Sequence, residues 1–133
     1  MFPMIVLWIY CISFIGFGLG FALAPDQLAD LVLGAIPSTP SALIDMRATY
    51  GGVAIGAGLF FGLCAAREQW VRPGLLLSLL VTGGLAVTRL IGFAVDGDPN
   101  GFMLLNLGLE VVAAVLSAAA LRQKEPSLVA TRR

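Results

Sequence analysis

Two charged side chains stand inside long apolar stretches of this 133-residue chain and are its first candidates for chemistry. Arg89 lies in the apolar run 73–95, and Glu110 lies in the run 102–121. Counted along a helix from the nearer ends of these runs, their depths are roughly 9 and 12 Å. A charge at the centre of a membrane costs about 2.5 to 3.5 kcal/mol, and pairing with an opposite charge is the usual remedy. The sequence therefore predicts that Arg89 and Glu110 form a pair.

Such a pair permits a structural or a functional role. A structural salt bridge would fix the register of two helices. A functional site would bind a polar headgroup, or would move a proton with Glu110 as candidate general acid or base and Arg89 binding an anionic group. Ionisable groups inside a membrane often have a function, and buried ion pairs are weak evidence for stability, so the sequence leaves both roles open. The other residues that we assign to this polar site are Asn106, Tyr50, Arg47, Asp45 and Asp96.

Helical spacing brings more polar residues to the same two helix faces. Residues separated by four or seven positions lie on one side of an α-helix. The polar residues with this spacing are Ser78, Thr82, Arg89 and Asp96 in the third apolar run, and Asn106, Glu110 and Ser117 in the fourth.

The elements that must position these residues are four apolar runs of membrane-spanning length, each near the ~20 residues that a helix needs to cross a bilayer. Their bounds are about 3–24, 48–66, 73–95 and 102–121. Hydrophobic residues make up 59% of the chain and charged residues only 12%, so lipid must cover surface that no polar shell could cover. We expect one all-α domain over residues 1–133, an antiparallel four-helix membrane bundle.

The basic residues predict the orientation of this bundle. By the positive-inside rule, loops rich in arginine and lysine are cytoplasmic. This places both termini in the cytoplasm, with a cytoplasmic tail over 122–133, and places the polar site in the outer half of the membrane. The basic residues that support this orientation are Arg67 and Arg72 in the second loop, and Arg122, Lys124, Arg132 and Arg133 after the fourth run.

A short amphipathic helix is predicted between the first two spans. From Pro25 to Ile36 the apolar residues repeat at helical intervals, and the acidic residues take the other face. Pro37 ends this helix, and Thr39 can cap the next one with Pro40 at its first position. We expect the short helix to lie at the interface and cover the outer end of the bundle; the alternative is a lid over an opening from the lipid.

The second run is rich in glycine and predicts close helix packing. Gly52 with Gly56, and Gly58 with Gly62, form two pairs of small residues that let another helix approach. The partner is a helix of this chain, with the first run the simpler choice, or a helix of a second copy. A phosphate-binding glycine loop would need a strand before it, and none is predicted.

Several classes of site are disfavoured by composition. The chain has no histidine, which removes the commonest metal ligand, and only two cysteines, Cys11 and Cys64, which we interpret as small core residues. We therefore expect no metal and no cofactor. The partners that we expect are the lipid bilayer, a lipid-like ligand or another membrane protein, and a second copy of the chain, with no nucleic acid.

An ordered set of motifs carries a family resemblance. The motifs are residues 45–52 (DMRATYGG), 89–92 (RLIG) and 96–99 (DGDP), followed by Glu110. Over nearly its whole length the chain resembles the bacterial four-helix membrane family of domain of unknown function DUF4345. This resemblance brings no established activity. The layout is also similar to that of the DoxX-like small membrane proteins, without a shared catalytic motif.

Three functions follow as hypotheses. The leading one is a small multi-pass accessory or binding protein whose polar site holds a lipid-phase ligand or a partner helix. The second is a membrane enzyme that performs proton transfer on a lipid-like substrate through Glu110. The third is a small transporter that uses a membrane carboxylate, but Arg89 would compete with a cationic substrate there.

Overall fold

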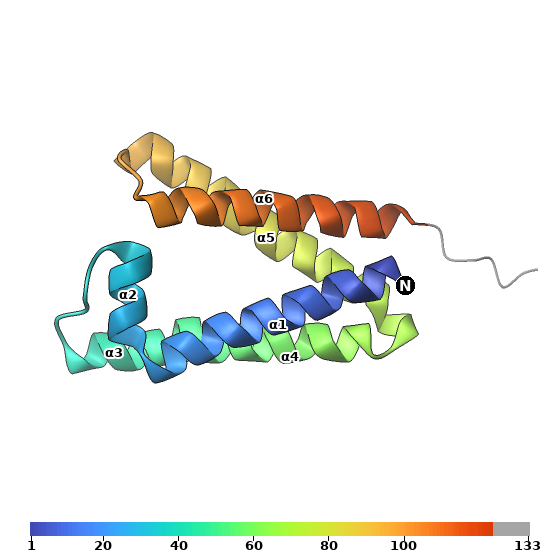
Figure 1. Ribbon diagram of the computed structural model, residues 1–133, viewed down its shortest axis with the longest axis horizontal. Helices are drawn as coiled ribbons and strands as arrows, with labels where there is room; N and C mark the ends of the chain where they lie inside the picture. Colours follow the sequence, from blue (N-terminus) through green and yellow to red (C-terminus); the bar gives the residue numbers. More distant parts are fainter. Residues whose placement is uncertain (124–133) are drawn as a thin grey trace, which may run out of the picture.

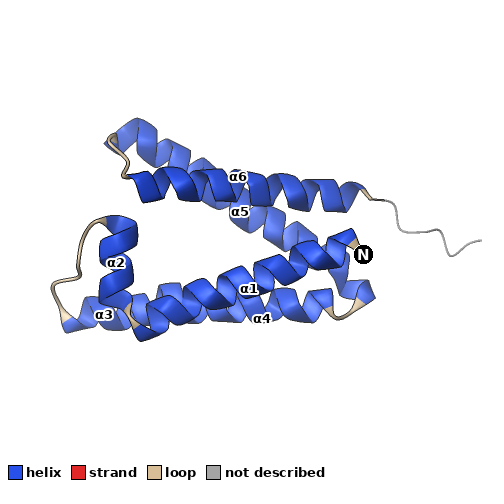
Figure 2. Ribbon diagram, in the orientation of Figure 1, coloured by secondary structure: helices blue, strands red, loops and turns tan. Residues whose placement is uncertain are grey.

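In the computed structural model, the described residues 1–123 form helices joined by short loops and contain no strand (Figures 1 and 2). The prediction of an all-α fold is confirmed. In chain order the elements are α1 (Phe2–Leu23), α2 (Pro25–Leu33), α3 (Pro40–Met46), the π-helical segment η1 (Arg47–Gly52), α4 (Val53–Ala65), α5 (Glu68–Asp96) and α6 (Gly101–Arg122).

Four helical stretches are long and apolar enough to cross a membrane. They are α1, the continuous stretch Pro40–Ala65 that joins α3, η1 and α4, then α5 and α6, with mean hydropathy between 1.5 and 2.1. The chain is therefore a multi-pass membrane protein.

Two of the predicted spans begin earlier in the structure. The second, predicted from residue 48, begins at Pro40, where Thr39 Oγ1 accepts a hydrogen bond from the Ala42 amide at 3.2 Å, as the capping prediction required. The third, predicted from Pro73, begins at Glu68 and contains that proline. Hydropathy marks only the apolar part of a helix, whereas a cap or an acidic first turn lets the helix continue into the polar interface.

The four spans form two pairs that meet at one end and diverge at the other (Figure 1). Helix α1 packs along α4, and α5 packs along α6. We call the end where the pairs meet, near the N-terminus, the closed end, and the end near α2 and the α5–α6 loop the open end. Glycine permits the close approach of α1 to its partner, because a Cβ on Gly18 would lie 2.8 Å from the Gly51 carbonyl oxygen.

The hydrophobic core lies in the closed half. Leu7 of α1, Phe61 and Cys64 of α4, Leu75 of α5 and Ala120 of α6 are all buried in one cluster. Tilted and edge-on aromatic contacts, such as Tyr10 against Phe61 with ring centroids 5.2 Å apart, extend this cluster toward the middle of the membrane. The two pairs are therefore joined mainly at this end.

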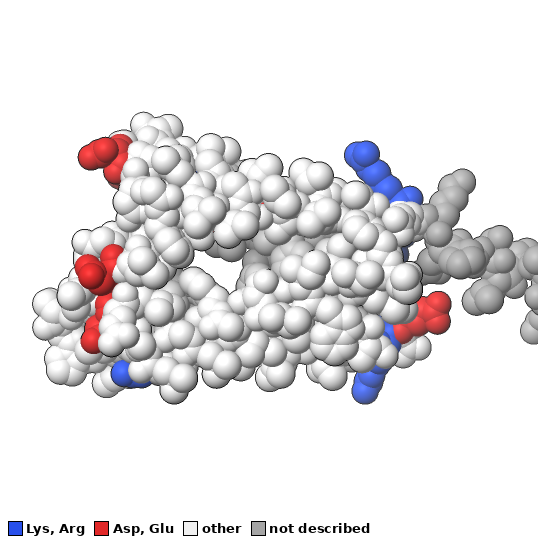
Figure 3. Space-filling model, in the orientation of Figure 1, with Lys and Arg blue, Asp and Glu red and all other residues white. Residues whose placement is uncertain are grey.

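At the open end, α2 spans the gap between the two pairs. It begins at Pro25, buries Ala29 and Val32, and ends at Leu33, three residues before the predicted end at Ile36, where Gly34 takes a left-handed conformation with φ 71°. The side-chain amide of Asn100, which precedes α6, donates to the Val32 carbonyl at 3.3 Å. Figure 3 shows an opening through the molecule beside this bridge. The predicted short amphipathic helix is confirmed, and it closes only part of the open end.

Candidate functional site

Charges are segregated between the two ends of the molecule. Figure 3 shows acidic groups at the open end and most basic groups at the closed end. Two residues depart from this pattern: Arg47 contacts the C-terminal end of α1, at the open end, and Glu68 begins α5, at the closed end. The remaining part of the predicted cytoplasmic tail, residues 124–133, lies outside the described residues. Arg89 and Glu110 lie between these two charged surfaces.

Arg89 and Glu110 meet in a two-pronged ion pair. Arg89 Nε donates to Glu110 Oε2 at 3.0 Å, and Arg89 Nη2 donates to Oε1 at 2.5 Å. The side chains are 19% and 11% exposed, so the pair is sheltered but not sealed. Charge-assisted bonds of this geometry fix both the distance and the orientation of the two groups. The pair therefore holds the guanidinium of α5 against the carboxylate of α6.

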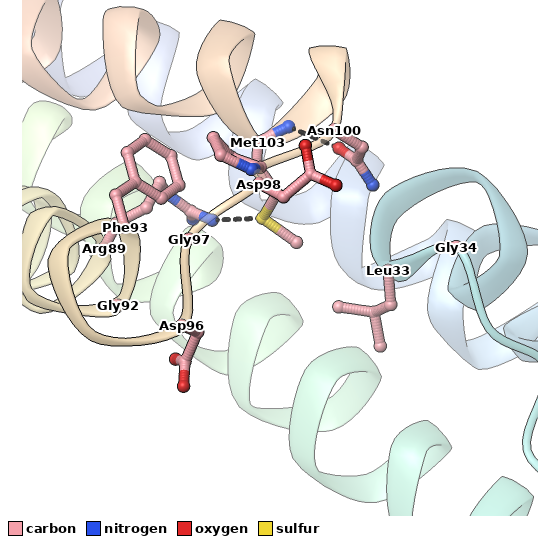
Figure 4. Close-up of a pocket in the computed structure, with 11 residues that line it drawn as sticks. Leu33, Gly34, Arg89, Gly92, Phe93, Asp96, Gly97, Asp98, Asn100 and Met103 are labelled. Carbon is pink, nitrogen blue, oxygen red and sulfur yellow. Dashed lines mark hydrogen bonds between the residues drawn. The ribbon is translucent and has the colours of Figure 1, made fainter.

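The remaining edge of the Arg89 guanidinium faces a weaker partner. Its Nη1 contacts the Met103 sulfur at 2.8 Å (Figure 4). A thioether is a poor hydrogen-bond acceptor, and a guanidinium has five N–H donors. Arg89 thus retains donor capacity on the side that faces away from Glu110.

That side faces a cavity of about 560 Å³ at the open end. Its walls come from the C-terminal ends of α2 and α5, the loop after α5 and the first turn of α6 (Figure 4). The lining residues are Leu33, Gly34, Arg89, Gly92, Phe93, Asp96, Gly97, Asp98, Pro99, Asn100 and Met103.

Two exposed carboxylates stand at the mouth of this cavity. Asp96 folds back along α5, with its Oδ2 3.8 Å from the position that a Cβ on Gly92 would take. Gly97 and Asp98 follow with positive φ values of 67° and 41°, which glycine adopts freely and aspartate tolerates. This turn ends α5 and places both carboxylates at the edge of the same cavity.

Residues predicted for one polar site are divided between two places. Arg89 and Glu110 pair on the α5–α6 side, and Asp96 lines the same cavity as Arg89. Tyr50 stacks instead on Phe21 of α1, with ring centroids 5.1 Å apart.

Two further predicted site residues, Arg47 and Asp45, also lie apart from the pair. Arg47 Nη1 donates to the carbonyls of Ala22 and, at 3.3 Å, Leu23, and so caps the end of α1. Asp45 is exposed beside Arg47, with its backbone carbonyl accepting from the Thr49 hydroxyl. Asn106 is half-buried on α6 and does not line the cavity.

With this geometry in place, comparison with known proteins identifies the family. Residues 3–121 match the family described as Domain of unknown function (DUF4345). The chain belongs to this family. No curated protein and no solved structure matches it significantly. The family resemblance predicted from the sequence is confirmed.

One motif of the DUF4345 resemblance has an unusual backbone. Residues Arg47–Gly52 form a π-helical segment inside the second span, a conformation often found at functional sites. Within it, a Cβ on Gly51 would lie 3.0 Å from the Ala22 amide nitrogen. The widened turn and the Arg47 cap thus clamp the end of α1 against the second span, a feature that hydropathy and spacing did not predict.

The glycine pairs of this DUF4345 chain differ in their surroundings. A Cβ on Gly58 would lie 2.7 Å from Ile15, and one on Gly62 would lie 2.9 Å from the Cys11 sulfur, so both glycines face α1. A Cβ on Gly56 would meet nothing within 4 Å, and one on Gly52 only the Arg47 carbonyl at 3.9 Å. Gly52 and Gly56 therefore make no close contact with another helix among residues 1–123.

A buried hydroxyl cluster joins three helices and includes one residue that sequence reasoning missed. The Tyr10 hydroxyl of α1 lies 3.1 Å from Thr82 Oγ1 and accepts from Ser117 Oγ at 3.0 Å. Ser78 Oγ lies 2.9 Å from Ser117 Oγ. The spacing of Ser78, Thr82 and Ser117 was noted from sequence, but Tyr10 was not. A lone tyrosine in an apolar run was the available signal, since buried hydroxyls find partners.

The two polar sites differ in the chemistry that they permit. In the hydroxyl cluster every hydroxyl oxygen has a partner, so the cluster has a packing role. At the Arg89–Glu110 pair, Arg89 Nη1 meets only the Met103 sulfur and adjoins an open cavity, so that site can bind an anionic or carbonyl oxygen. In residues 1–123 no three acidic or cysteine side chains come together as they would around a metal ion.

Proposed function

We propose that this chain is a small bacterial inner-membrane binding protein that holds a lipid-phase ligand in the cavity beside Arg89. The observation that carries the proposal is the position of the Arg89 guanidinium. One of its edges is fixed by Glu110, and the other adjoins a cavity of about 560 Å³ and meets only a thioether. A polar oxygen of a ligand would replace the thioether as a stronger acceptor.

A purely structural role explains this geometry less well. An ion pair that only fixes helix register is best sealed and fully hydrogen-bonded, because each unsatisfied polar group in a membrane is costly. The Arg89–Glu110 pair instead lies beside open space of a size typical for small-molecule sites. The pair is better suited to orient a guanidinium toward a ligand.

The splayed arrangement of the helix pairs supports access from the membrane. The opening beside α2 in Figure 3 lies between the α1–α4 pair and the α5–α6 pair. Within a bilayer such an opening is filled by acyl chains, so a lipid-phase ligand reaches the cavity without crossing water. In this proposal α2 covers the cavity from the aqueous side.

The proposed orientation has both termini in the cytoplasm and the cavity in the outer half of the membrane. It rests on the acidic open end and the basic closed end (Figure 3). Reporter fusions at Arg133 and at Asn100 test it: we expect the reporters on opposite sides, cytoplasmic and external respectively. Both reporters on one side would contradict a chain with four spans.

Native mass spectrometry from mild detergent tests ligand binding. We expect the wild-type chain to retain a small molecule and the Gly92→Leu variant to lose it. Gly92 lines the cavity, and a Cβ there meets only Asp96 at 3.8 Å, so the larger side chain fills the cavity instead of displacing backbone.

The matched control is Gly84→Leu, the same substitution on the same helix. A Cβ at Gly84 meets nothing within 4 Å, and this residue does not line the cavity. Gly84→Leu should retain the ligand. A wild-type chain without a bound molecule, or equal retention by the two variants, would contradict the proposal.

The Glu110→Gln variant distinguishes the binding role from the enzyme and transporter hypotheses. Both carboxylate oxygens of Glu110 accept from Arg89, which leaves the carboxylate poorly placed to exchange protons. A binding role therefore predicts that the Gln variant, at normal abundance in the membrane, complements a deletion strain. Failure to complement despite normal abundance would instead favour proton-transfer chemistry or a carboxylate-dependent transporter.

A further inference from the structure

The charges of the cavity change sign between its wall and its mouth. Arg89 lies in the wall, and Asp96 follows it by seven residues on the same face of α5, about 10 Å farther along the helix axis. Asp98 lies in the turn after α5. Among residues 1–123 the only ion pair is that of Arg89 with Glu110, so neither aspartate is neutralised by a protein cation. The cavity thus offers cationic donors inside and free carboxylates at its rim.

The position of Asp96 strengthens the negative potential at the mouth. It is the last residue of α5, where the helix dipole already places partial negative charge. A carboxylate at this position is unfavourable for the helix by itself, and a cation beside it is favourable. The mouth therefore favours a positively charged group, and the Arg89 side of the cavity favours an anionic one.

We infer that the bound ligand is a phospholipid with a phosphoethanolamine headgroup, an inference that rests on the proposed function. Its phosphate oxygens accept from Arg89 Nη1 in place of the Met103 sulfur. Its ammonium group donates to the Asp96 carboxylate, and the Asp98 carboxylate, which Figure 4 shows on the other side of the loop after α5, adds to the negative potential of the cavity. A phosphate and an ammonium separated by two carbons can lie along this face of α5, between the Arg89 guanidinium and the Asp96 carboxylate that folds back toward Gly92.

The apolar walls fit the rest of such a lipid. Leu33, Phe93 and Met103 line the cavity beside the charged groups and can contact the glycerol and the first acyl carbons. The acyl chains leave through the opening between the two helix pairs (Figure 3).

Other common headgroups match the cavity less well. A glycerol headgroup brings the same phosphate without a cation, so the rim carboxylates repel it. A choline headgroup has no N–H to donate, and its quaternary ammonium is recognised by aromatic cages, whereas Phe93 is the only aromatic residue that lines this cavity.

A competition between lipids of identical acyl chains tests the inference. The full chain is equilibrated with equal amounts of palmitoyl-oleoyl phosphatidylethanolamine and phosphatidylglycerol, and the retained lipids are counted by native mass spectrometry. One exposed charge contact with Asp96 and the added negative potential of Asp98 predict a preference of about fivefold for phosphatidylethanolamine. In Asp96→Asn/Asp98→Asn the preference should fall to about one, because the phosphate contact with Arg89 is unchanged.

The control removes two acidic residues at the same end of the molecule that do not line the cavity. Asp26→Asn/Asp30→Asn, on α2, should keep the wild-type preference. Equal retention of the two lipids by the wild-type chain, or an unchanged preference in Asp96→Asn/Asp98→Asn, would overturn the headgroup assignment while leaving the proposed function intact. Retention of neither phospholipid would overturn the assignment to a phospholipid, and a wild-type chain that retains no small molecule of any kind would overturn the proposed function itself.

A second arm separates the lipid from its soluble headgroup. Free phosphoethanolamine at the concentration of the lipid should leave the bound lipid in place, because the apolar walls contact only the lipid. Complete displacement by the free headgroup would show that the site takes a water-soluble ligand and would overturn the assignment to a phospholipid.

Discussion

In the closed half of the molecule, polar side chains meet as neutral hydroxyls inside a packed core, whereas toward the open end they meet as charges beside a cavity. Ser78 and Ser117 are fully buried at 0% exposure, and their hydroxyl groups bond to each other and to backbone carbonyls. Arg89 and Glu110 remain 19% and 11% exposed.

The difference teaches how polarity is used inside this bundle. A hydroxyl has few hydrogen-bond sites, and a helix carbonyl or a second hydroxyl can satisfy all of them, so sealing it costs little. A guanidinium with five donors is harder to satisfy, and one carboxylate leaves part of it free. We therefore interpret the hydroxyl cluster as structural and the charged pair as the binding site. Four sets of substitutions test these two assignments and the helix contacts in each half of the molecule, in order of decreasing expected effect.

Removing the cation of the charged pair should have the largest effect. Arg89→Ala leaves the Glu110 carboxylate without its partner, at a cost on the order of 3 kcal/mol in the free energy of unfolding. Unfolding in mixed micelles measures the loss. The double variant Arg89→Leu/Glu110→Leu should recover most of it, because neither charge then remains in the membrane. A double variant no more stable than the weaker single variant would show that the two residues are not energetic partners.

The contact of α1 with α4 should be next in sensitivity. Gly58→Val places a Cβ 2.9 Å from the Ile15 amide nitrogen and 3.0 Å from the Cys11 carbonyl oxygen. Backbone atoms cannot move aside as a side chain can, so we expect a loss of about 2 kcal/mol. Gly56→Val, two residues away with nothing within 4 Å, is the matched control. In thermal unfolding in detergent, the midpoint temperature should fall for Gly58→Val and not for Gly56→Val. Equal midpoints would count against the packing assignment.

The bridge at the open end should contribute less. The Asn100 side chain accepts from the Met103 amide at 2.8 Å, capping α6, and donates to the Val32 carbonyl at 3.3 Å. Asn100→Ala should cost about 1 kcal/mol, the usual loss for a helix cap.

Asn100→Asp separates the two contacts of this side chain. It keeps an oxygen for the cap but loses the donor to α2, so it should preserve most of the stability. Hydrogen exchange of the α2 amides should nevertheless rise in both variants. Unchanged exchange in α2 would show that the bridge does not hold this helix over the open end.

The smallest effect is expected in the hydroxyl cluster. Tyr10→Phe removes one hydroxyl but leaves Thr82 bonded to the Ser78 carbonyl and Ser117 bonded to the Ala113 carbonyl. Because these partners remain satisfied, we expect a loss of about 0.6 kcal/mol, the average for a hydrogen bond between membrane helices. Tyr50→Phe, at an exposed ring, is the control. A loss of several kcal/mol, or loss of bound ligand in Tyr10→Phe, would assign this cluster a role beyond packing.

The sequence by itself determined the class of the protein and the composition of its charged site. Four long apolar runs have to be helices, because a lipid-covered backbone must satisfy its own hydrogen bonds. Two opposite charges at similar depth in consecutive helices had to pair, because unpaired charges in a membrane are costly. Even the cap at Thr39 followed from residue types alone, since capping depends on a few neighbouring residues.

Only the tertiary structure decided what surrounds that pair. Tyr50 and Arg47 have the depth expected for the site, but they contact the end of α1, because depth along a helix does not specify direction around it. The cavity depends on the splay of the two helix pairs and on the position of α2, which are set by packing across the bundle. The π-helical turn at Arg47–Gly52 and the partners of Tyr10 have the same origin. Local sequence specifies which groups must find a partner, whereas the choice of partner depends on contacts between distant parts of the chain.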